Sequence, residues 1–270
     1  MEHLDIIKTL DAIKNEKVSG EQQHYHCERC QDQGIYFVEG KAVICNCKLA
    51  EIRNEHRNLS GITPYLQKQT FSAFDLSYYD NEKQDKNGMT YRNKAEKIYE
   101  EARKFVQNIA SGEVVEGMMF TGPVGSGKTF LAAAIANGLI DCDCKVKFVV
   151  MPDFLDEIRD SYRLNAENSE KDLMAEIKHV PVLVLDDLGA HNYTDFAVRT
   201  IYAILNYRMN YQLPTVVTTN LSGEEIEKEL GSRILSRLVA SCRFFRLGNT
   251  EDIRRKKRLR TMGKDEAITE

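Results

Sequence analysis

The sequence has 270 residues, a size that allows one full domain with a small attachment or two small domains, and that excludes a repeat array or a large multidomain assembly. Hydrophobic residues make up 42% of the chain and charged residues 29%, so it can bury a core, and disorder throughout is excluded. The net charge of −4 excludes a protein coated in basic surface. Any contact with nucleic acid must therefore come from a local group of basic residues.

The N-terminal segment predicts a short amphipathic helix over residues 1–18, because Leu4, Ile7, Leu10 and Ile13 recur at three-residue steps. Acidic residues interrupt the apolar ones, so the segment indicates neither a secretory signal nor a membrane anchor. No stretch of the chain reaches the roughly 18 consecutive apolar residues of a transmembrane helix. We therefore expect a cytoplasmic protein without membrane contact.

Four of the seven cysteines cluster near the N-terminus. They form two closely spaced pairs, Cys27 with Cys30 and Cys45 with Cys47. Thiols stay reduced in the cytoplasm, where a clustered set binds metal more often than it forms disulfides. Four thiolates on two short turns can surround Zn²⁺ tetrahedrally, and such a closed site is structural because no position remains for water. The residues between the pairs predict a β-hairpin with its turn at Glu39-Gly40.

The remaining candidates near this site are two histidines and three further cysteines. His24 and His26 precede the first pair, and either could replace one cysteine ligand, because the second pair has a tighter spacer than is usual. Cys142, Cys144 and Cys242 have no second pair nearby, so we interpret them as structural.

The chain changes in character near residue 65. Residues 49–59 predict a polar helix, and an aromatic-rich stretch follows Pro64. The next run, NEKQDKNG, has the composition of an exposed loop. We therefore divide the chain into a zinc-binding module at 1–64, a linker at 65–90 and a large domain at 91–270.

The large domain alternates helices with short apolar strands. Helices are expected at 91–110, 128–140, 153–164, 169–178, 195–210 and 223–239, and a basic helix ends the chain. The apolar runs between them are GMMFTG, KVKFVV, VPVLVLDD, PTVVTT and CRFFRL. Strands separated by such helices predict an α/β fold with a parallel sheet that helices cover on both faces.

A phosphate-binding loop connects the first of these strands to an alanine-rich helix. Its sequence, GPVGSGKT, matches the pattern G-x-x-x-x-G-K-[ST]. The glycines let backbone N–H groups face the β-phosphate, Lys128 neutralises phosphate oxygens, and the Thr129 hydroxyl is placed to ligate Mg²⁺. The helix that begins near Lys128 adds the positive end of its dipole. The residues expected to bind ATP and Mg²⁺ are Gly122, Pro123, Val124, Gly125, Ser126, Gly127, Lys128 and Thr129, together with Asp186.

Carboxylates follow a second buried strand, Val182–Leu185. This strand brings Asp186 to the carboxyl edge of the sheet, where a phosphate-binding loop needs a metal ligand. We interpret Asp186 as the partner of Mg²⁺, and Asp187 as a group that orients or deprotonates the attacking water.

Other candidate catalytic residues have weaker patterns. The strand at 214–219 ends at Asn220, whose amide could contact the water or the γ-phosphate, although asparagine is also a common turn residue. Arg233 and Arg237 lie four residues apart on one predicted helix face. Either could reach the nucleotide of a neighbouring subunit, or both could be solvated charges.

In this order, the motifs GPVGSGKT, VLVLDDLG, TTN and GSRILSRL resemble those of AAA+ ATPases, and specifically the bacterial and phage helicase loaders of the DnaC/DnaI type and their IstB-like relatives. The similarity extends from about Thr70 to Arg255. The resemblance implies an AAA+ core that assembles into a ring or spiral. It also implies that Asn220 is sensor 1, that Arg237 or Arg233 is the arginine finger, and that Arg254 is similar to the sensor 2 arginine.

The resemblance also implies partners. Members of the family bind single-stranded DNA, and Arg159, Tyr162 and Phe196 are similar in position to their DNA-binding residues, although the sequence alone favours an apolar helix face for the two aromatic ones. Zinc-bearing N-terminal regions of DnaI-like loaders bind the hexameric replicative helicase. The same role is implied for residues 1–60.

Two features depart from many AAA+ proteins. The second acid of the Walker B strand is Asp187 instead of glutamate, which implies slow hydrolysis. The chain ends at residue 270, too soon after Leu247 for a full C-terminal lid.

The sequence as a whole predicts an ATPase that loads the replicative helicase onto single-stranded DNA in DNA replication. The alternative is an IstB-like helper of a transposase, which shares the ATPase core, and the zinc module favours the loader. A zinc-containing binding module with a degenerate nucleotide site is disfavoured by the intact Lys128, Thr129 and Asp186. The basic run at 254–260 could contact phosphate or form a solvated helix end.

Overall fold

The computed structural model describes residues 25–85, 87–163, 167–190, 193–248 and 251–266. The chain divides into two compact units, Met1–Ala50 and Glu51–Glu270. The predicted helix at 1–18 lies outside the described residues. None of the described helices combines the length and the apolar character that crossing a membrane requires.

The first unit contains a β-hairpin of β1 (Ile35–Val38) and β2 (Lys41–Ile44), which pair antiparallel. Its turn residues Glu39 and Gly40 both have a positive φ, 51° and 78°. Two consecutive residues with positive φ are typical of the type I′ turn, whose twist matches that of the flanking strands. The hairpin predicted between the cysteine pairs is therefore confirmed. Cys45 separates β2 from helix α2 (Asn46–Leu59).

The second unit is built on a parallel sheet of five strands. They are β3 (Gly117–Thr121), β4 (Val146–Val150), β5 (Val182–Leu188), β6 (Thr215–Thr219) and β7 (Cys242–Arg246). In space their order is β4-β5-β6-β3-β7, and every neighbouring pair is parallel. Because β6 lies between β3 and β5, the segments that follow these three strands meet at one edge of the sheet.

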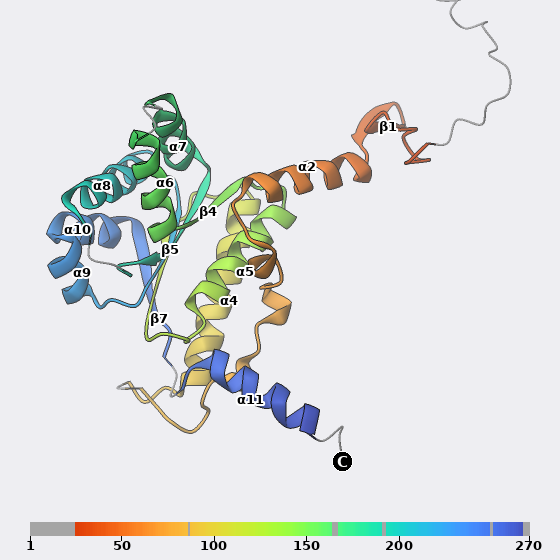
Figure 1. Ribbon diagram of the computed structural model, residues 1–270. Helices are drawn as coiled ribbons and strands as arrows, with labels where there is room; N and C mark the ends of the chain where they lie inside the picture. The colour runs from red at the N-terminus through yellow and green to blue at the C-terminus, as the bar shows by residue number, and fades with distance from the viewer. Residues whose placement is uncertain (1–24, 86, 164–166, 191–192, 249–250, 267–270) are drawn as a thin grey trace, which may run out of the picture. The chain divides into compact units, whose positions relative to one another are not determined.

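Helices cover both faces of this sheet (Figure 1). On one face lie α4 (Tyr91–Ala110) and α5 (Lys128–Asp141). The other face is covered by α6 (Met151–Arg163), α7 (Glu167–His179), α8 (Asp195–Asn210), α9 (Gly223–Leu230) and α10 (Ser232–Ser241). The smaller helices are α3 (Pro64–Gln67), the 3₁₀ turns η1 (Phe71–Ala73) and η2 (Leu76–Tyr78), and α11 (Ile253–Glu266). The predicted α/β core is confirmed, and helix α11 follows β7.

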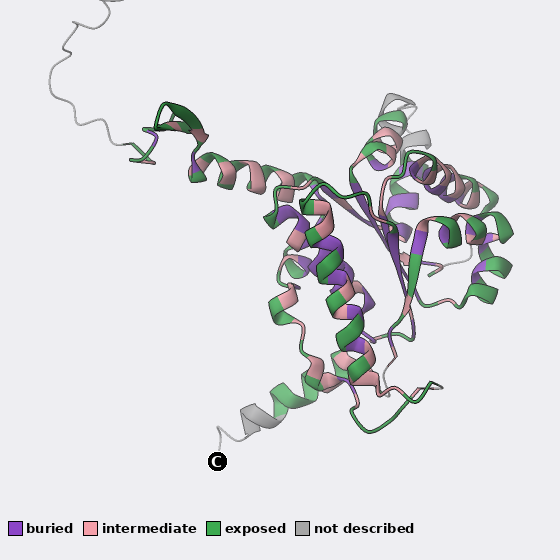
Figure 2. Cartoon of the chain, turned by 180° about the vertical axis from the view of Figure 1, so that it is seen from behind, coloured by how far each residue is buried: buried purple, intermediate pink, exposed green. Residues whose placement is uncertain are grey.

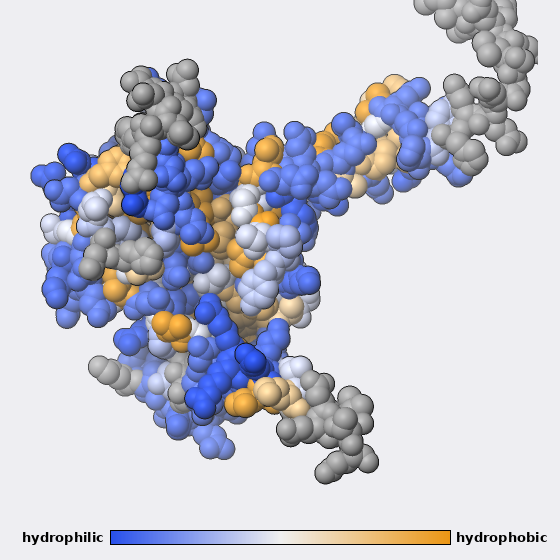
Figure 3. Space-filling model, in the orientation of Figure 1, coloured by the Kyte–Doolittle hydropathy of each residue, from blue (hydrophilic) through white to orange (hydrophobic). Residues whose placement is uncertain are grey.

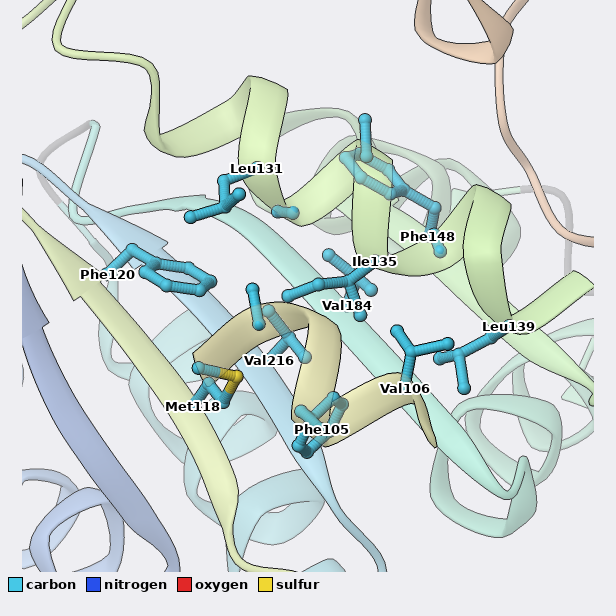
Figure 4. Packing of buried hydrophobic residues seen from close by; sticks show 14 of the residues in the cluster. Phe105, Val106, Met118, Phe120, Leu131, Ile135, Leu139, Phe148, Val184 and Val216 are labelled. Atoms are coloured by element: carbon cyan, nitrogen blue, oxygen red, sulfur yellow. The ribbon is translucent and has the colours of Figure 1, made fainter. Parts of the chain in front are cut away.

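Helix α5 is apolar around most of its circumference, because it lies between the sheet and α4. Figure 4 shows Leu131 and Ile135 of α5 facing side chains of three central strands, and Figure 2 shows the same helix and strands as largely buried. The strand residues in this contact include Phe120, Val184 and Val216. Burial of each such side chain contributes about 1.5–3 kcal/mol, so the helix after the phosphate-binding loop has a fixed position on the sheet.

The segment at 65–90, which the sequence assigns to a linker, contributes to the core of the second unit. Leu66 and Tyr79 are buried in the same cluster as α5. The side-chain amide of Asn137, on α5, donates to the carbonyls of Leu66 and Gln69 at 2.9 and 3.0 Å. These contacts join the segment to the helix that follows the phosphate-binding loop. The division at residues 64 and 90 stays a prediction.

Candidate functional site: a nucleotide-binding edge and a cysteine cluster

The phosphate-binding loop adopts a conformation that two of its glycines make possible. Gly125 and Gly127 have φ values of 71° and 96°, which residues with a side chain rarely adopt. A Cβ atom at Gly125 would overlap the carboxylate of Asp252, and one at Gly127 would lie 2.5 Å from the hydroxyl of Tyr79. The loop therefore needs glycine both for its backbone conformation and for the groups packed behind it.

Tyr79 supports this loop from the segment that precedes the sheet. Its hydroxyl donates a hydrogen bond to the carbonyl of Ser126 at 2.8 Å, and its side chain is 2% exposed. Burial raises the pKa of Tyr79, so the phenol stays protonated and remains a donor. The buried Ser126 hydroxyl has no hydrogen-bond partner among the described groups. A polar atom left unpaired in this loop fits a site that receives a polar ligand.

Lys128, the first residue of α5, has its ammonium group at the centre of the site. It donates to the carbonyls of Gly122 and Pro123, both at 2.8 Å, and to the amide oxygen of Asn220 at 2.7 Å. The side chain is 5% exposed, and burial lowers the pKa of Lys128 to about 8, while the nearby charges of Asp187 and Asp186 oppose this shift. The ammonium form therefore predominates at neutral pH. A cation at the start of a helix is the group that a phosphate requires.

The acids at the end of β5 differ in their surroundings. Asp186 is buried, and burial raises its pKa, while hydrogen bonds from the side chains of Thr218 and Thr129 act in the opposite direction. Asp187 is half-buried, and its φ of 60° lies in the left-handed region. Because Asp186 contacts Thr129, the carboxylate and the hydroxyl expected to hold Mg²⁺ lie together.

Strand β6 brings the third element of the site to the same edge. Asn220 directly follows β6 and accepts the hydrogen bond from Lys128. The structure thus brings Lys128, Asp186 and Asn220 together from three neighbouring strands. The remaining members of the predicted set, from Gly122 to Thr129, form the turn and first residues of α5.

The predicted arginines lie on two different helices. Arg254 is exposed in the first turn of α11, and its positive charge contributes to the lowered pKa of Lys128, so it lies on the side of the nucleotide-binding edge. Arg237, on α10, lies with its guanidinium 5.8 Å from the centroid of the Tyr202 ring of α8, and Arg233 is exposed on the same helix. Arg237 and Arg233 are not among the groups that shift the pKa of Lys128.

Helix α11 presents a strongly hydrophilic surface, which Figure 3 shows in blue. Two of its basic residues contact the segment at η2. Lys256 donates to the carbonyl of Tyr78 at 3.3 Å, and Arg260 donates to the hydroxyl of Ser77 at 2.9 Å. The guanidinium of Arg260 also lies 4.3 Å from the centroid of the Tyr78 ring. These two residues of the basic run are thus engaged within the chain.

The structure does not bring the expected DNA-binding residues together in one described group. Arg159 is exposed on α6 and forms an ion pair with Asp156, one turn earlier. Phe196, on α8, is half-buried and packs against the core cluster beneath that helix. Tyr162 lies in α6, but its side chain is outside the described ones. The packing of Phe196 agrees with the apolar-face interpretation that the sequence left open.

The four N-terminal cysteines converge. The Sγ atoms of Cys27, Cys30, Cys45 and Cys47 all lie within 4.8 Å of one another. The Sγ atoms of Cys27 and Cys45 are 3.6 Å apart, and those of Cys30 and Cys47 are 3.3 Å apart. Tetrahedral Zn²⁺ with four bonds of about 2.3 Å needs sulfur atoms about 3.8 Å apart, so this donor set fits the ion.

The other thiols and the described histidine lie outside this cluster. His26 is fully exposed, while the carboxylate of Asp32 accepts from the backbone N–H groups of His26 and Cys27. His24 lies outside the described residues. The remaining cysteines of the chain are not part of the cluster: Cys142, Cys144 and Cys242.

Three residues of the second unit have roles that the sequence did not reveal. Tyr79 contacts the phosphate-binding loop, Thr218 contacts Asp186, and Arg208 forms a buried hydrogen-bond centre. Thr218 precedes Asn220 by two residues in the TTN motif, near the end of β6. That spacing was the one available signal. Tyr79 and Arg208 are single residues without a motif.

Comparisons with known proteins agree with this geometry. The family described as IstB-like ATP binding protein matches residues 92–261. The chain is similar to the replicative helicase loader DnaC of Escherichia coli (strain K12), with 32% identity over 193 residues, 72% of this chain and 69% of DnaC. It is also similar to the replicative helicase loader DnaI of Bacillus subtilis (strain 168), with 34% identity over 113 residues, 42% of this chain and 35% of DnaI.

Comparison with solved structures also indicates similarity to the helicase loaders. A crystal structure of DnaI superposes with a TM-score of 0.56 and 26% identity, over 74% of this chain and 99% of that one. The predicted AAA+ architecture is thereby confirmed. The chain belongs to the IstB-like ATP-binding family and is of the DnaC/DnaI type.

Proposed function

We propose that the protein is an ATP-dependent loader that binds the replicative helicase and delivers it onto single-stranded DNA during DNA replication. DnaC of Escherichia coli, which aligns with 72% of this chain, is named a replicative helicase loader, and so is DnaI of Bacillus subtilis, which aligns with 42%. The observation that carries the ATP-dependent part is the meeting of Lys128, Asp186 and Asn220 at one edge of the sheet. A parallel sheet of this kind binds its ligand at that edge.

The phosphate-binding loop and α5 would hold ATP. Lys128 supplies the cation, and the first N–H groups of α5 have no acceptor within the helix, so they are free to face phosphate oxygens. Asp186 and the hydroxyl of Thr129 would hold Mg²⁺, which neutralises phosphate charge when it is bound. Lys128 must exchange at least one of its three present acceptors for a phosphate oxygen.

Hydrolysis would use the groups beside this pair. Asp187 would orient the attacking water and accept its proton, and Asn220 would orient the water or the γ-phosphate. The short side chain of Asp187 leaves the base farther from the water than glutamate would, so we expect a slow ATPase. Arg254 would complete the site from α11. Arg237 or Arg233 would act on the nucleotide of a neighbouring subunit in a ring or spiral.

The cysteine cluster would hold one structural Zn²⁺. Its four ligands leave no position for water, so the ion would stabilise the fold of the first unit and take no part in hydrolysis. Beside it, the hairpin exposes apolar side chains, with Phe37 70% exposed. An apolar surface on a small unit suits contact with a protein partner, and we assign the replicative helicase to it.

Contact with DNA would involve residues of α6, α8 and α11. Arg159 and the basic residues of α11 would contact the phosphate backbone, and Tyr162 and Phe196 would stack on bases where they are accessible. These partners, and the absence of a membrane-spanning helix among the described residues, suit a cytoplasmic protein.

A loading assay tests the proposal. The full-length protein, the replicative helicase of the same organism and ATP are incubated with circular single-stranded DNA covered by single-strand-binding protein, and the helicase retained on the circle is counted. Wild-type protein should increase retention many-fold, and Lys128→Ala should not. If the wild-type protein neither associates with the helicase nor increases its retention, the proposal is wrong.

An IstB-like helper of a transposase is the second candidate, and the family match itself favours it. Such a protein would coat double-stranded DNA over long stretches in the presence of ATP. ATP-dependent binding to duplex DNA, without any effect on helicase retention, would identify that function.

A further inference from the structure

The pairing of β5 with β6 is interrupted where β5 carries its two acids. The register is regular up to the pair Leu185 with Val217, and the next pair is Leu188 with Thr219. Strand β5 advances by three residues while β6 advances by two, so β5 contains one extra residue at Asp186–Asp187. This is a β-bulge, a feature that redirects side chains and occurs often beside active sites.

Thr218 is the residue of β6 that lies opposite this bulge. Its hydroxyl oxygen accepts a hydrogen bond from the backbone N–H of Asp187 at 3.0 Å. The same hydroxyl donates to Oδ1 of Asp186 at 2.6 Å. A hydroxyl has one proton and two lone pairs, so these two bonds use its proton and one lone pair. One side chain thus links both acids.

The site makes these two bonds hard to replace. Thr218 is completely buried, so water does not reach its hydroxyl or substitute for it. Asp187 has a φ of 60°, a conformation that strains a residue with a side chain. The bond from its N–H to Thr218 stabilises that conformation. The bond to Asp186 fixes the position of one carboxylate oxygen.

We propose that Thr218 is a positioning residue of the nucleotide site, which fixes the metal-binding carboxylate of Asp186 and the bulged backbone of Asp187. The inference rests on the proposed ATPase function, since it assigns Asp186 to Mg²⁺ and Asp187 to the attacking water. Thr218 touches neither reactant and acts through the two acids.

The test replaces the hydroxyl by a methyl group of similar size in Thr218→Val. Two quantities are measured on the full chain: the affinity for a fluorescent ATP analogue as Mg²⁺ is varied, including zero Mg²⁺ with EDTA, and the kcat of ATP hydrolysis. In EDTA the affinity should stay within about twofold. The Mg²⁺ concentration at which the affinity for the analogue has increased by half of its maximal amount should rise about tenfold or more. The kcat should fall about tenfold or more. Both changes are expected for the loss of a hydrogen bond to a charged group.

Thr215→Val is the matched control. It removes a buried hydroxyl from the same strand, but that hydroxyl accepts from Arg208 at 2.9 Å and contacts neither acid. It should leave the Mg²⁺ dependence within about twofold, even if it lowers the melting temperature. Thr218→Ser keeps the hydroxyl and should restore most of the Mg²⁺ response. Thr218→Ala repeats the test without a methyl group against the carboxylate, in case the valine variant folds poorly.

The inference is wrong if Thr218→Val and Thr218→Ala keep the wild-type Mg²⁺ dependence and kcat, if Thr215→Val shifts the Mg²⁺ dependence as much as they do, or if Thr218→Ser restores nothing. A wild-type protein that binds ATP without hydrolysing it would instead contradict the ATPase proposal. The Mg²⁺ dependence of analogue binding would then still decide the role of Thr218.

Discussion

The ammonium group of Lys128 donates a hydrogen bond to the amide oxygen of Asn220 at 2.7 Å, and this bond joins the start of α5 to the end of β6. The two residues are far apart in sequence, and they meet because β6 lies beside β3 in the sheet. Asn220 is thus placed to respond to any movement of Lys128 toward phosphate. We therefore expect replacements of the two residues to have different effects on ATP binding and on ATP hydrolysis.

Replacement of Asn220 by alanine should reduce hydrolysis more than binding. Lys128 keeps two carbonyl acceptors in Asn220→Ala and remains available to phosphate, so the affinity for ATP should change by less than about threefold. The kcat should fall about tenfold or more, because an orienting group has been removed from the reacting atoms. The kcat is measured from the phosphate released at fixed times, and the affinity is measured from the binding of a fluorescent ATP analogue. Lys128→Ala, by contrast, should lose binding itself, and a variant of Lys128 that binds ATP normally would contradict the site.

Replacement of Tyr79 by phenylalanine should weaken nucleotide binding without unfolding the protein. The variant loses one hydrogen bond to the Ser126 carbonyl, a bond worth about 0.5–1.5 kcal/mol, so the Kd for ATP should rise about two- to tenfold. Tyr99→Phe is the matched control, because its hydroxyl also donates to a backbone carbonyl, that of Phe71, but does not contact the loop. Equal effects of the two variants on Kd would show that Tyr79 does not act through the loop.

The sequence predicted the parts of this site that are contiguous in the chain. The eight residues from Gly122 to Thr129 form the turn and the first residues of α5, and an apolar run sets the position of Asp186, so their chemistry can be derived from local order. Tyr79 and Ser126 are 47 residues apart, and Thr218 and Asp186 are 32 apart. Such contacts depend on the order of the strands in the sheet and on a bulge in β5, and neither feature can be predicted from a single sequence.

Arg208 is a further residue whose role, in this case in stability, could not be predicted from the sequence. Its guanidinium is buried, no carboxylate of the described residues pairs with it, and burial lowers the pKa of Arg208 to about 9. It donates to the hydroxyl of Thr215 and to five backbone carbonyls, those of Ile177, Lys178, Val180, Pro181 and Pro214. The sequence shows only a polar residue in the last turn of a helix, where a solvated side chain is the usual outcome.

Replacement of Arg208 by methionine should therefore be strongly destabilising. It leaves buried carbonyls without donors at the starts of β5 and β6, and the free energy of unfolding should fall by about 3 kcal/mol or more. Urea denaturation measures the change. Arg199→Met, at an exposed position of the same helix, should alter stability by no more than about 0.5 kcal/mol. A loss of stability at Arg208 as small as that at Arg199 would contradict this account.

The ion pair between Lys94 and Asp85 predicts a dependence of stability on pH. The two side chains approach to 2.6 Å, and the hydrogen bond from Lys94 is the main cause that lowers the pKa of Asp85 below its ordinary value of 3.8. Because the pKa is lower in the folded state, the unfolded state binds more protons as the pH falls, and the contribution of the pair is lost. Wild-type protein should be more stable than Lys94→Met at pH 7, and the difference should shrink below about pH 4. Urea midpoints at both pH values test this; a difference that is equal at pH 7 and pH 3 would exclude the ion pair as its cause.

Removal of a cysteine from the N-terminal cluster should release zinc without affecting the nucleotide site. Full-length wild-type protein should contain about one zinc per chain by elemental analysis, whereas Cys30→Ser and Cys45→Ser should contain little, because a three-thiolate site binds the ion far more weakly. Cys142→Ser is the matched control, since that thiol is exposed and lies outside the cluster, and it should keep the full zinc content.

The zinc-deficient variants should lose association with the helicase but bind the ATP analogue with wild-type affinity, because the zinc ligands and the phosphate-binding loop lie in separate units. Wild-type protein purified without zinc, or loss of zinc from Cys142→Ser as complete as from Cys30→Ser, would contradict the assignment of the four ligands.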